Sequence, residues 1–362
     1  MKICYIGDAA SVHTKRWVEW FADKGYNVHL ITDRPGYINN VEVHRIKEGR
    51  SPISFIREMM AVKKEVKKIK PDILHAHYAS SYGTFGAYSG FHPFIVSVWG
   101  SDVLIDPKKS KFVNKCVHYT LKKADVITTD GKNTYDEMLN NLGADIDKLN
   151  IIYHGVNTKM FSPDKKDDNF SKELFNEKCP VAISVRFLNE KNDMETFLKS
   201  VPLVLEKVKN AKFIIGGNGP KEQELKDIAK SLGISDSVYF TGYIKHSELP
   251  KYLASSTVYV STALWDGGIS VVTLDAMACG LPIISTNIAN ASQWIQDNEN
   301  GFLIETKDYK TLAEKLIFLL QFTETSKRLG EKNRNIIEEK QNEELEMKKV
   351  ALLYHNLVEG NR

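Results

Sequence analysis

Cysteine, long apolar runs and net charge are all scarce in this sequence of 362 residues. The four cysteines, Cys4, Cys116, Cys179 and Cys279, lie far apart and form no CxxC pair. Neither a disulfide framework nor a metal-ligand cluster is therefore indicated. No apolar run reaches the ~18 residues that a membrane-spanning helix needs. The opening segment MKICYIGDAA lacks the layout of a signal peptide, so we expect a cytoplasmic location.

The net charge is only +3, but it is unevenly divided along the chain. Residues 1–157 carry 22 Lys and Arg against 17 Asp and Glu, whereas residues 158–362 carry 27 against 29. Much of the excess lies in two segments with basic amphipathic character, 56–72 and 106–123. Such helices either rest on an anionic membrane surface, as a peripheral protein of the inner face would, or present a solvated basic side. Nucleic acid is not an expected partner, because this modest excess lacks interleaved aromatic residues.

Short apolar runs alternate with segments of helical period almost from end to end, which is typical of parallel α/β sheets. The expected strands are KICYIG, VHLIT, VEVHRI, ILHAH, FIVSVW, VITT and IIYHG in the front half, then VAISV, FIIGG, VYFTG, VYVST, PIIST and FLIE. The length suits two domains. We therefore predict an α/β protein with two Rossmann-like, doubly wound domains that face each other across a cleft.

The predicted boundaries follow from where the strand pattern stops and restarts. The first domain spans 1–156, and a polar segment that includes a short helix, 157–178, serves as a linker. The second domain spans 179–340. The remaining segment, 341–362, forms a helix that packs back on the domains.

Ligands of such sheets bind beyond the carboxyl ends of the strands, so the loops there are the first candidates for a site. The loop SVRFLNEKND places Arg186 and Lys191 five residues apart without nearby acids to neutralise both. Together they would clamp a diphosphate, or they are ordinary surface charges. The loop GGNGP, with Gly217, either lets the backbone approach a ligand or simply makes a tight turn.

The segment ALWDGGISVVTLDAMACG, residues 263–280, contains a second candidate site. Ser270 is a helix N-cap, and Gly280 suits the end of that helix. Gly267 and Gly268 then bring backbone N–H groups to a helix start that favours phosphate. Asp275 lies among apolar residues of the helix, where it either binds two ribose hydroxyls or marks an exposed stripe.

Taken in order, these features resemble the retaining, nucleotide-sugar-dependent glycosyltransferases of the GT-B fold, family 4. The resemblance is carried by VRFLNEKN, GNGP, VYFTGYIKHSELPKYLASSTVYVST and LDAMACGLPIIST, and in the front half by GDAASVHTKRWVEWFADKGYNVHLI, PDILHAHYASSYG and VSVWGSDVL. It implies transfer of a sugar from a nucleoside-diphosphate sugar to a hydroxyl of a glycan or lipid-linked glycan, in polysaccharide or glycoconjugate synthesis. It implies no obligatory metal or other cofactor.

The resemblance also assigns roles to individual residues. It implies that Arg186 and Lys191 stabilise the diphosphate leaving group and that Asp275 holds the ribose. The backbone near the phosphates or donor sugar would be that of Gly268, Ile269 and Ser270, and Gly242 and Tyr243 would lie near the base. The other side of the cleft would present Gly7, Asp8, Ala9 and His13.

The sequence departs from the family pattern at several places, and one of them is Asn192, which stands where the family has a glycine after the lysine. The family's first glutamate falls on Gly267, and Asp266 stands one residue earlier, so Asp266 is the candidate for sugar choice. A histidine of the reaction centre is replaced by Trp99, which either stacks on a sugar or packs in the core. The role of that histidine would be vacant, or it would pass to a neighbour such as Asp102 or His13.

His77 is a candidate for touching the acceptor, with a structural role as the alternative. Two other functions stay open at this point. One is a nucleotide-sugar epimerase or hydrolase on the same scaffold. The other is a non-catalytic, nucleotide-binding relative.

Overall fold

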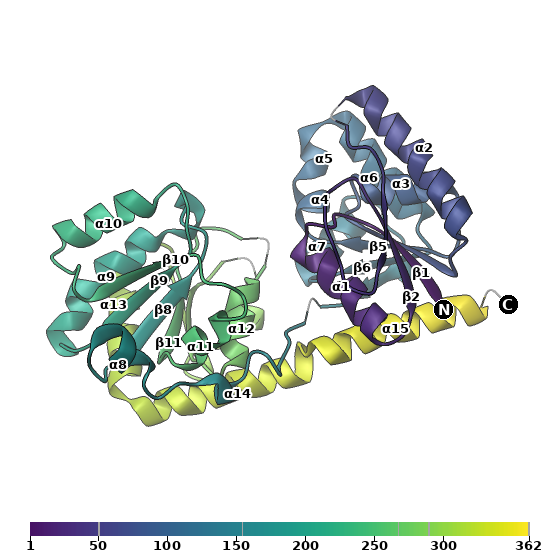
Figure 1. The fold of residues 1–362 in the computed structure, drawn as a ribbon. Helices are drawn as coiled ribbons and strands as arrows, with labels where there is room; N and C mark the ends of the chain where they lie inside the picture. Colours follow the sequence, from purple (N-terminus) through teal and green to yellow (C-terminus); the bar gives the residue numbers. More distant parts are fainter. Residues whose placement is uncertain (50, 154, 267, 289, 361–362) are drawn as a thin grey trace. The chain divides into compact units, whose positions relative to one another are not determined.

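The computed structural model describes residues 1–49, 51–153, 155–266, 268–288 and 290–360. The chain divides into two compact units, one formed by residues 1–154 with 344–362 and the other by residues 155–343. In Figure 1 the first unit runs from purple to blue and includes the yellow helix α15, and the second runs from teal to yellow-green. Each unit contains one parallel sheet.

The sheet of the first unit has seven parallel strands in the order β3-β2-β1-β4-β5-β6-β7. The strands are β1 (Lys2–Ile6), β2 (Asn27–Thr32), β3 (Glu42–Arg45), β4 (Ile73–His77), β5 (Phe94–Val98), β6 (Val126–Thr129) and β7 (Leu149–Ile151). Residues of β4 and β5 are buried throughout, as expected for strands covered on both faces.

Helices cover both faces of this sheet. The two faces can be told apart at β1, where alternate residues belong to two different hydrophobic clusters. The helices are α1 (Val12–Asp23), α2 (Pro52–Ile69), α3 (Tyr82–Ser89), α4 (Ser101–Leu104), α5 (Asp106–Lys109), α6 (Lys111–Lys123), α7 (Lys132–Asn140) and α15 (Glu343–Gly360), with a short 3₁₀ turn at Ile146–Lys148.

The last helix, α15, is part of the first unit's core although it comes nearly 200 residues later in the chain. Tyr354 is fully buried, and its hydroxyl lies 2.9 Å from that of Tyr5. It also hydrogen-bonds Nδ1 of His75, whose Nε2 lies 2.7 Å from the hydroxyl of Ser97. This buried polar chain fixes the position of α15 on the sheet.

The second unit has six parallel strands in the order β10-β9-β8-β11-β12-β13. They are β8 (Val181–Val185), β9 (Lys212–Gly216), β10 (Val238–Gly242), β11 (Val258–Ser261), β12 (Ile283–Thr286) and β13 (Gly301–Ile304). The helices are α8 (Phe170–Phe175), α9 (Met194–Lys207), α10 (Glu222–Ser231), α11 (Leu249–Ala254), α12 (Val271–Ala278), α13 (Tyr309–Gln321) and α14 (Thr323–Lys340), with 3₁₀ turns at Pro163–Lys165, Glu190–Asn192 and Ala291–Gln293.

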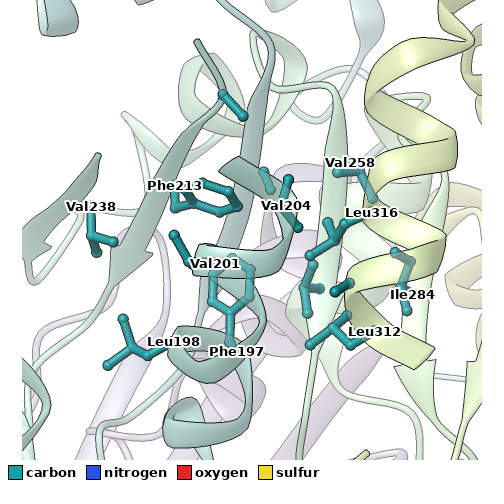
Figure 2. Close-up of a cluster of buried hydrophobic side chains, with 14 of the residues drawn as sticks. Phe197, Leu198, Val201, Val204, Phe213, Val238, Val258, Ile284, Leu312 and Leu316 are labelled. Atoms are coloured by element: carbon teal, nitrogen blue, oxygen red, sulfur yellow. The ribbon is translucent and has the colours of Figure 1, made fainter. Parts of the chain in front are cut away.

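The core of the second unit lies between its sheet and helices α9 and α13. Figure 2 shows Phe197 and Val201 of α9 beside Leu312 and Leu316 of α13, all packed with Phe213 of β9. These five side chains are fully buried. Burial of a large side chain stabilises a fold by roughly 1.5–3 kcal/mol, so this layer holds the strand ends in place.

The observed boundaries differ from those predicted in three places. The division falls after residue 154 rather than 156, and the predicted linker 157–178 belongs to the second unit. It is held there because Arg334 of α14 donates to the carbonyl oxygens of Thr158 and Phe161 at 3.0 and 2.7 Å. The strand predicted at IIYHG lies earlier, as β7. The segment predicted to form a helix packing back on the domains supplies α15, which belongs to the first unit.

Each sheet has one point where the strand order reverses. In the first unit this point lies between β1 and β4, and in the second between β8 and β11. Adjacent parallel strands at such a point send their following helices to opposite faces, which leaves a crevice beyond the carboxyl ends. The loops that follow these four strands are therefore the places to build a site.

None of the described helices is both long and apolar enough to cross a membrane.

Candidate functional site

In the second unit, the loops after β8 and β11 bring two cations onto one carboxylate. Nη2 of Arg186 lies 2.7 Å from Oδ2 of Asp266, and Nζ of Lys191 lies 3.0 Å from Oδ1 of the same side chain. The two cationic side chains are 11% and 26% exposed. The sequence-predicted pair therefore does converge, at the carboxyl edge of the sheet.

Local hydrogen bonds hold the loop that carries both cations. The backbone N–H of Arg186 donates to the carbonyl of Gly216 at 3.0 Å. Asn189 caps the turn Glu190–Asn192 by accepting from the backbone N–H of Asn192. The Asn192 amide in turn donates to the carbonyl of Phe187 at 2.7 Å. The loop thus has a fixed shape, and Asn192, which stands where the family has glycine, helps to fix it.

The premise that no acid neutralises both cations is wrong, because Asp266 pairs with both. Partial burial on its own would raise the pKa of Asp266. The hydrogen bonds and positive charges of Arg186 and Lys191 outweigh that effect and lower the pKa below its ordinary value. The carboxylate is therefore ionised at neutral pH, and the three groups together carry one net positive charge.

Trp265 belongs to the same cluster and was not identified from the sequence. Its ring lies under Nζ of Lys191, with 4.5 Å between the nitrogen and the ring centroid, and its side chain is 59% exposed. The neighbouring N–H of Leu264 donates to the carbonyl of Lys191 at 2.8 Å. A tryptophan in the loop just before the predicted phosphate-facing helix start is the signal in the sequence that could have identified it.

The glycine-rich loop packs directly against the cation-bearing loop. A Cβ on Gly217 would lie 2.0 Å from the carbonyl oxygen of Arg186, and Gly217 has a φ of +119°, so only glycine fits. Its N–H donates to the carbonyl of Gly242 at 2.8 Å. Tyr243, which follows Gly242 in the chain, is 71% exposed. Close packing alone therefore explains why residue 217 is glycine. The exposed side chain of Tyr243 is available to a ligand.

The start of α12 forms as predicted, although one of its N–H groups is already used. Ser270 is the N-cap and accepts from the N–H of Thr273 at 3.2 Å. The N–H of Ile269 donates to the side-chain oxygen of Asn290 at 3.1 Å, and a Cβ on Gly268 would lie 3.5 Å from that oxygen. Gly267 lies outside the described residues. A phosphate at this helix start would have to share or replace Asn290.

Asp275 is only 4% exposed, in the second turn of α12. Its interpretation as a member of an exposed stripe is therefore wrong. A carboxylate at this depth costs free energy unless polar groups surround it. The ribose-binding role remains a prediction.

In the first unit, the predicted Gly7–Ala9 loop follows β1 at the switch point. The N–H of Gly7 donates to the carbonyl of Ile31 at 3.1 Å, and that of Ala9 to the hydroxyl of Thr32 at 3.2 Å. Asp8 accepts from the N–H of Ala10 at 2.8 Å. The loop is thus pinned to β2, and Asp8 shapes the turn.

His13 and Trp99 lie together beside this loop. Their rings stack with 5.5 Å between centroids and 21° between planes. The residue His13 is exposed while Trp99 is half-buried. Loss of solvent around the ring, and then the charge of Arg16, lower the pKa of His13. The imidazole is therefore neutral at neutral pH and can accept a proton or a hydrogen bond.

His77 is enclosed rather than open to an acceptor, which runs against that prediction. It is 2% exposed, and its Nδ1 lies 3.2 Å from the hydroxyl of Thr14. The rings of Tyr5, Trp17 and Trp99 pack edge-on against it at centroid distances of 5.2 to 5.4 Å. Burial lowers the pKa of His77 to about 3, so it stays neutral.

Asp102 is also fully buried and does not reach solvent. Its oxygens accept from the backbone N–H groups of Ala79 at 2.7 Å and Trp99 at 3.1 Å. It joins the loops after β4 and β5. Asp102 thus holds the backbone of Trp99, and its place at the reaction centre remains a prediction.

The predicted residues form two groups, one within each unit. A separate set of ligand-type side chains lies at the edge of the first sheet, where His29, Glu42 and His44 approach one another. The prediction that the chain has no metal-ligand cluster was drawn from sequence spacing. That spacing misses residues brought together by strand pairing.

The amino-acid sequence matches two family models. One, described as glycosyl transferase 4-like, matches residues 2–131, and the other, glycosyl transferases group 1, matches residues 165–336. Among curated relatives, N-acetyl-alpha-D-glucosaminyl L-malate synthase of Bacillus anthracis is 22% identical, over 99% of this chain and 97% of that protein.

Solved structures of two proteins share the fold. HepE of Anabaena in complex with UDP has a TM-score of 0.83 at 15% identity, covering 99% of this chain and 100% of that one. Another structure of HepE, in complex with UDP-glucose, has a TM-score of 0.79. Sucrose-phosphate synthase of Thermosynechococcus elongatus has a TM-score of 0.80 at 18% identity, with the same coverage. The structural likeness shows the GT-B fold, and the two family models show that this chain is a transferase that belongs to the group 1, family 4-like glycosyltransferases.

Proposed function

We propose that the protein is a retaining glycosyltransferase that moves a sugar from a nucleoside-diphosphate sugar to a hydroxyl of a glycan or lipid-linked glycan. The observation that carries the proposal is the convergence of Arg186 and Lys191 at the switch point of the second sheet. The family membership supports it, as does the fold that the chain shares with HepE, which was solved in complex with UDP-glucose.

In the proposed reaction, the bond between the anomeric carbon and the β-phosphate oxygen breaks, and its electron pair goes to that oxygen. Arg186 and Lys191 stabilise the developing negative charge, which is preorganised electrostatic catalysis. The acceptor oxygen bonds to the anomeric carbon on the face that the phosphate leaves. Its proton passes to the departing phosphate. No protein nucleophile takes part.

Asp266 would hold the two cations before the donor arrives. Its oxygens lie 2.7 and 3.0 Å from the same nitrogens that a diphosphate would contact. A diphosphate brings more negative charge than one carboxylate, so it competes effectively for both cations. Once displaced, Asp266 is one residue from the family's sugar-contacting position, and we propose that it then contacts the donor sugar.

On the first unit, His13 and Trp99 are the proposed acceptor-side residues. Their stacked rings offer an exposed imidazole next to a half-buried indole. An indole face packs well on a sugar ring, and a neutral imidazole accepts a hydrogen bond from a hydroxyl. Asp102 contributes by holding the Trp99 backbone.

The test is acceptor-dependent release of nucleoside diphosphate from a panel of nucleotide sugars with a polyprenyl-linked acceptor. Arg186→Ala is expected to abolish most turnover, and Arg328→Ala, an exposed arginine of the same unit, is the matched control. NMR of the product reports whether the anomeric configuration is retained. Release without acceptor, or a new sugar epimer, would instead favour the hydrolase or epimerase.

We also propose that the acceptor side rests on an anionic membrane. Ile53, Ile56 and Met60 of α2 are 80%, 55% and 59% exposed, and they recur on one side of the helix. Phe112 at the start of α6 is 60% exposed and contacts Phe55 of α2, with 5.6 Å between ring centroids. Both helices thus contribute to one exposed apolar stripe.

Lysines surround this stripe. Lys64, Lys67 and Lys68 of α2 and Lys111 and Lys115 of α6 are exposed. Apolar side chains flanked by lysines are the pattern of a segment that enters the headgroup region of an anionic bilayer. A lipid-linked acceptor would be found at the same surface.

Vesicle sedimentation tests this surface. Lys64→Glu with Lys67→Glu is expected to reduce binding to vesicles that contain phosphatidylglycerol by on the order of tenfold or more, since each lysine contributes ~1 kcal/mol. Lys209→Glu with Lys230→Glu, two exposed lysines of the second unit, makes the same charge change elsewhere. Equal binding to neutral and anionic vesicles would refute the proposal.

A further inference from the structure

Three side chains that commonly bind transition metals meet at the edge of the first sheet. His29 lies on β2, and Glu42 and His44 lie on the edge strand β3. The facing ligand atoms are Nδ1 of His29, Nε2 of His44 and the two carboxylate oxygens of Glu42. All three residues belong to the first unit, and none of them has a part in the proposed transfer reaction.

Strand register brings them together. In the parallel pairing of β2 with β3, His29 is opposite Glu42, and Ile31 is opposite His44. Residues two apart on a strand share a face, so Glu42 and His44 both project toward the side that His29 occupies. Twelve residues lie between His29 and Glu42 in the chain. The sequence alone therefore gives no recognisable metal-ligand motif.

The separations of the ligand atoms suit a tetrahedral ion. Nδ1 of His29 is 2.9 Å from Nε2 of His44, and each of these nitrogens is 3.5 Å from a different oxygen of Glu42. Bonds of about 2.0–2.2 Å to a tetrahedral zinc ion place neighbouring ligand atoms about 3.3–3.6 Å apart. Each nitrogen already has one Glu42 oxygen at this separation, so a rotation of the carboxylate would present one oxygen to both, and the two rings need to move apart by only a few tenths of an ångström.

The surroundings place a carboxylate near the ring of His44, whereas the buried Nε2 of His29 has no hydrogen-bond partner among the described residues. The other ring nitrogen of His44, Nδ1, lies 3.7 Å from a carboxylate oxygen of Glu65 on α2. A carboxylate behind a ligating histidine orients the ring and raises its basicity. The side chains of His29 and His44 are only 8% and 13% exposed, while that of Glu42 is 65% exposed. The two histidines are thus nearly buried, while Glu42 leaves the site accessible to solvent.

We propose that His29, Glu42 and His44 bind one divalent transition-metal ion of the zinc type, with water as the fourth ligand. Two imidazoles and one carboxylate favour such an ion over Mg²⁺ or Ca²⁺, which prefer oxygen ligands. The ion would link the edge strand β3 to β2 and, through Glu65, to α2. Its role is structural, because the three ligands and Glu65 belong to the sheet edge and α2 rather than to the loops at the switch points.

The experiment is calorimetric titration of ZnCl₂ into the tag-free full chain after treatment with a chelator. One ion is expected to bind, and saturating zinc is expected to raise the melting temperature by mass action. Glu42→Gln and His44→Ala should each weaken binding tenfold or more. Glu65→Gln should weaken it by about tenfold, as is typical for the residue behind a ligand. Co²⁺ in place of zinc should give the visible absorption of a tetrahedral site.

His246→Ala is the matched control, because it removes an exposed histidine of the other unit. Glu42→Gln guards against misfolding, since this exposed side chain changes only its charge and a carboxylate oxygen. Absence of zinc binding by the wild-type chain, or identical titrations for the wild type, Glu42→Gln and His44→Ala, would overturn the proposal. The pair His29–His44 would then be only an imidazole–imidazole hydrogen bond.

Discussion

The two units have the same architecture at their switch points but opposite chemistry. In the second unit the loops after β8 and β11 present two cations and a carboxylate, Arg186, Lys191 and Asp266. In the first unit the corresponding region presents an uncharged stack of His13 on Trp99. The same parallel sheet therefore supplies a place for a ligand in both units, while the loop side chains decide which kind of ligand it suits.

This difference fits a division of labour. Cations held at a sheet edge suit a diphosphate, whereas an aromatic ring and a neutral imidazole suit an uncharged sugar. Changes in the second unit should therefore affect the nucleotide, and changes in the first should affect the acceptor. Four predictions test this separation.

The largest effect is expected from Arg186→Ala. It removes a donor to the departing diphosphate, and we expect kcat/KM to fall by on the order of 10²-fold or more. Arg186→Lys should recover only part of the loss, because lysine lacks the planar fork of the guanidinium. Steady-state release of nucleoside diphosphate measures both. Unchanged turnover in Arg186→Ala would refute the claim that the cations of the second unit stabilise the diphosphate.

Trp99→Ala should weaken acceptor binding and leave nucleotide binding unchanged. Loss of the ring face is expected to raise the KM for the acceptor about tenfold, from one aromatic contact of roughly 1.5 kcal/mol. Trp99→Phe should lose less. Calorimetric titration with the nucleoside diphosphate serves as the control and should give the wild-type affinity. A tenfold loss of nucleotide affinity in Trp99→Ala would mean that the division of labour is wrong.

Mild acid should destabilise the first unit more than the second. Burial lowers the pKa of His77 to about 3 and that of His75 as well. The unfolded chain binds these two protons below about pH 6.5 and the folded chain does not, so the stability present above pH 6.5 falls as the pH drops. The slope is about 1.4 kcal/mol per pH unit for each histidine, and proton uptake by Asp102 and Asp130, whose pKa values burial raises to about 7 and about 6, offsets part of this loss. Residues 155–343 contain only His246.

Hydrogen exchange, corrected for the intrinsic effect of pH on exchange, resolves the two units at pH 7 and pH 5. Protection of β4 and β5 should fall more than that of β8 and β9. His77→Asn should reduce the difference, and His355→Asn, an exposed histidine of the same unit, should not. Equal losses in both units would contradict the prediction.

The smallest expected effect is that of Asp266→Asn on nucleotide binding. Removing the carboxylate charge leaves Arg186 and Lys191 without the competitor that pairs with both. The affinity for a nucleoside diphosphate should therefore rise by a few fold. Discrimination between nucleotide sugars should weaken if Asp266 also contacts the sugar. Titration with the free diphosphate separates the first effect from the second, and weaker binding would show that Asp266 orients the cations rather than competes for them.

Much of the fold could be predicted because its signals are local. Runs of buried apolar residues mark the strands, and Ser270 and Gly280 mark the two ends of α12 within one turn of their own positions. The segment 157–178 was misjudged for the opposite reason. It is mostly polar, and the contacts that hold it on the second unit come from distant residues such as Lys251 and Arg334.

The features of the site likewise divide into those that a local segment predicts and those that depend on distant residues. Arg186 and Lys191 could be identified because they share one loop after one strand. The pairing with Asp266, about 80 residues away, depends on β8 and β11 being neighbours in the sheet. Burial of His77 and Asp102 likewise depends on side chains from several strands and helices, so it could not be predicted from the sequence.

Short segments of the sequence are enough to give the strand and helix order, the helix start at Ser270, the two cations and the family. Periodicity, capping and motif order are properties of short segments, and they do not depend on distant partners. The tertiary structure alone decided that Asp266 neutralises the cation pair, that α15 completes the first unit through Tyr354, and that His29 and His44 meet across β2 and β3. These contacts depend on sheet order and strand register, which are set by the packing of the whole unit.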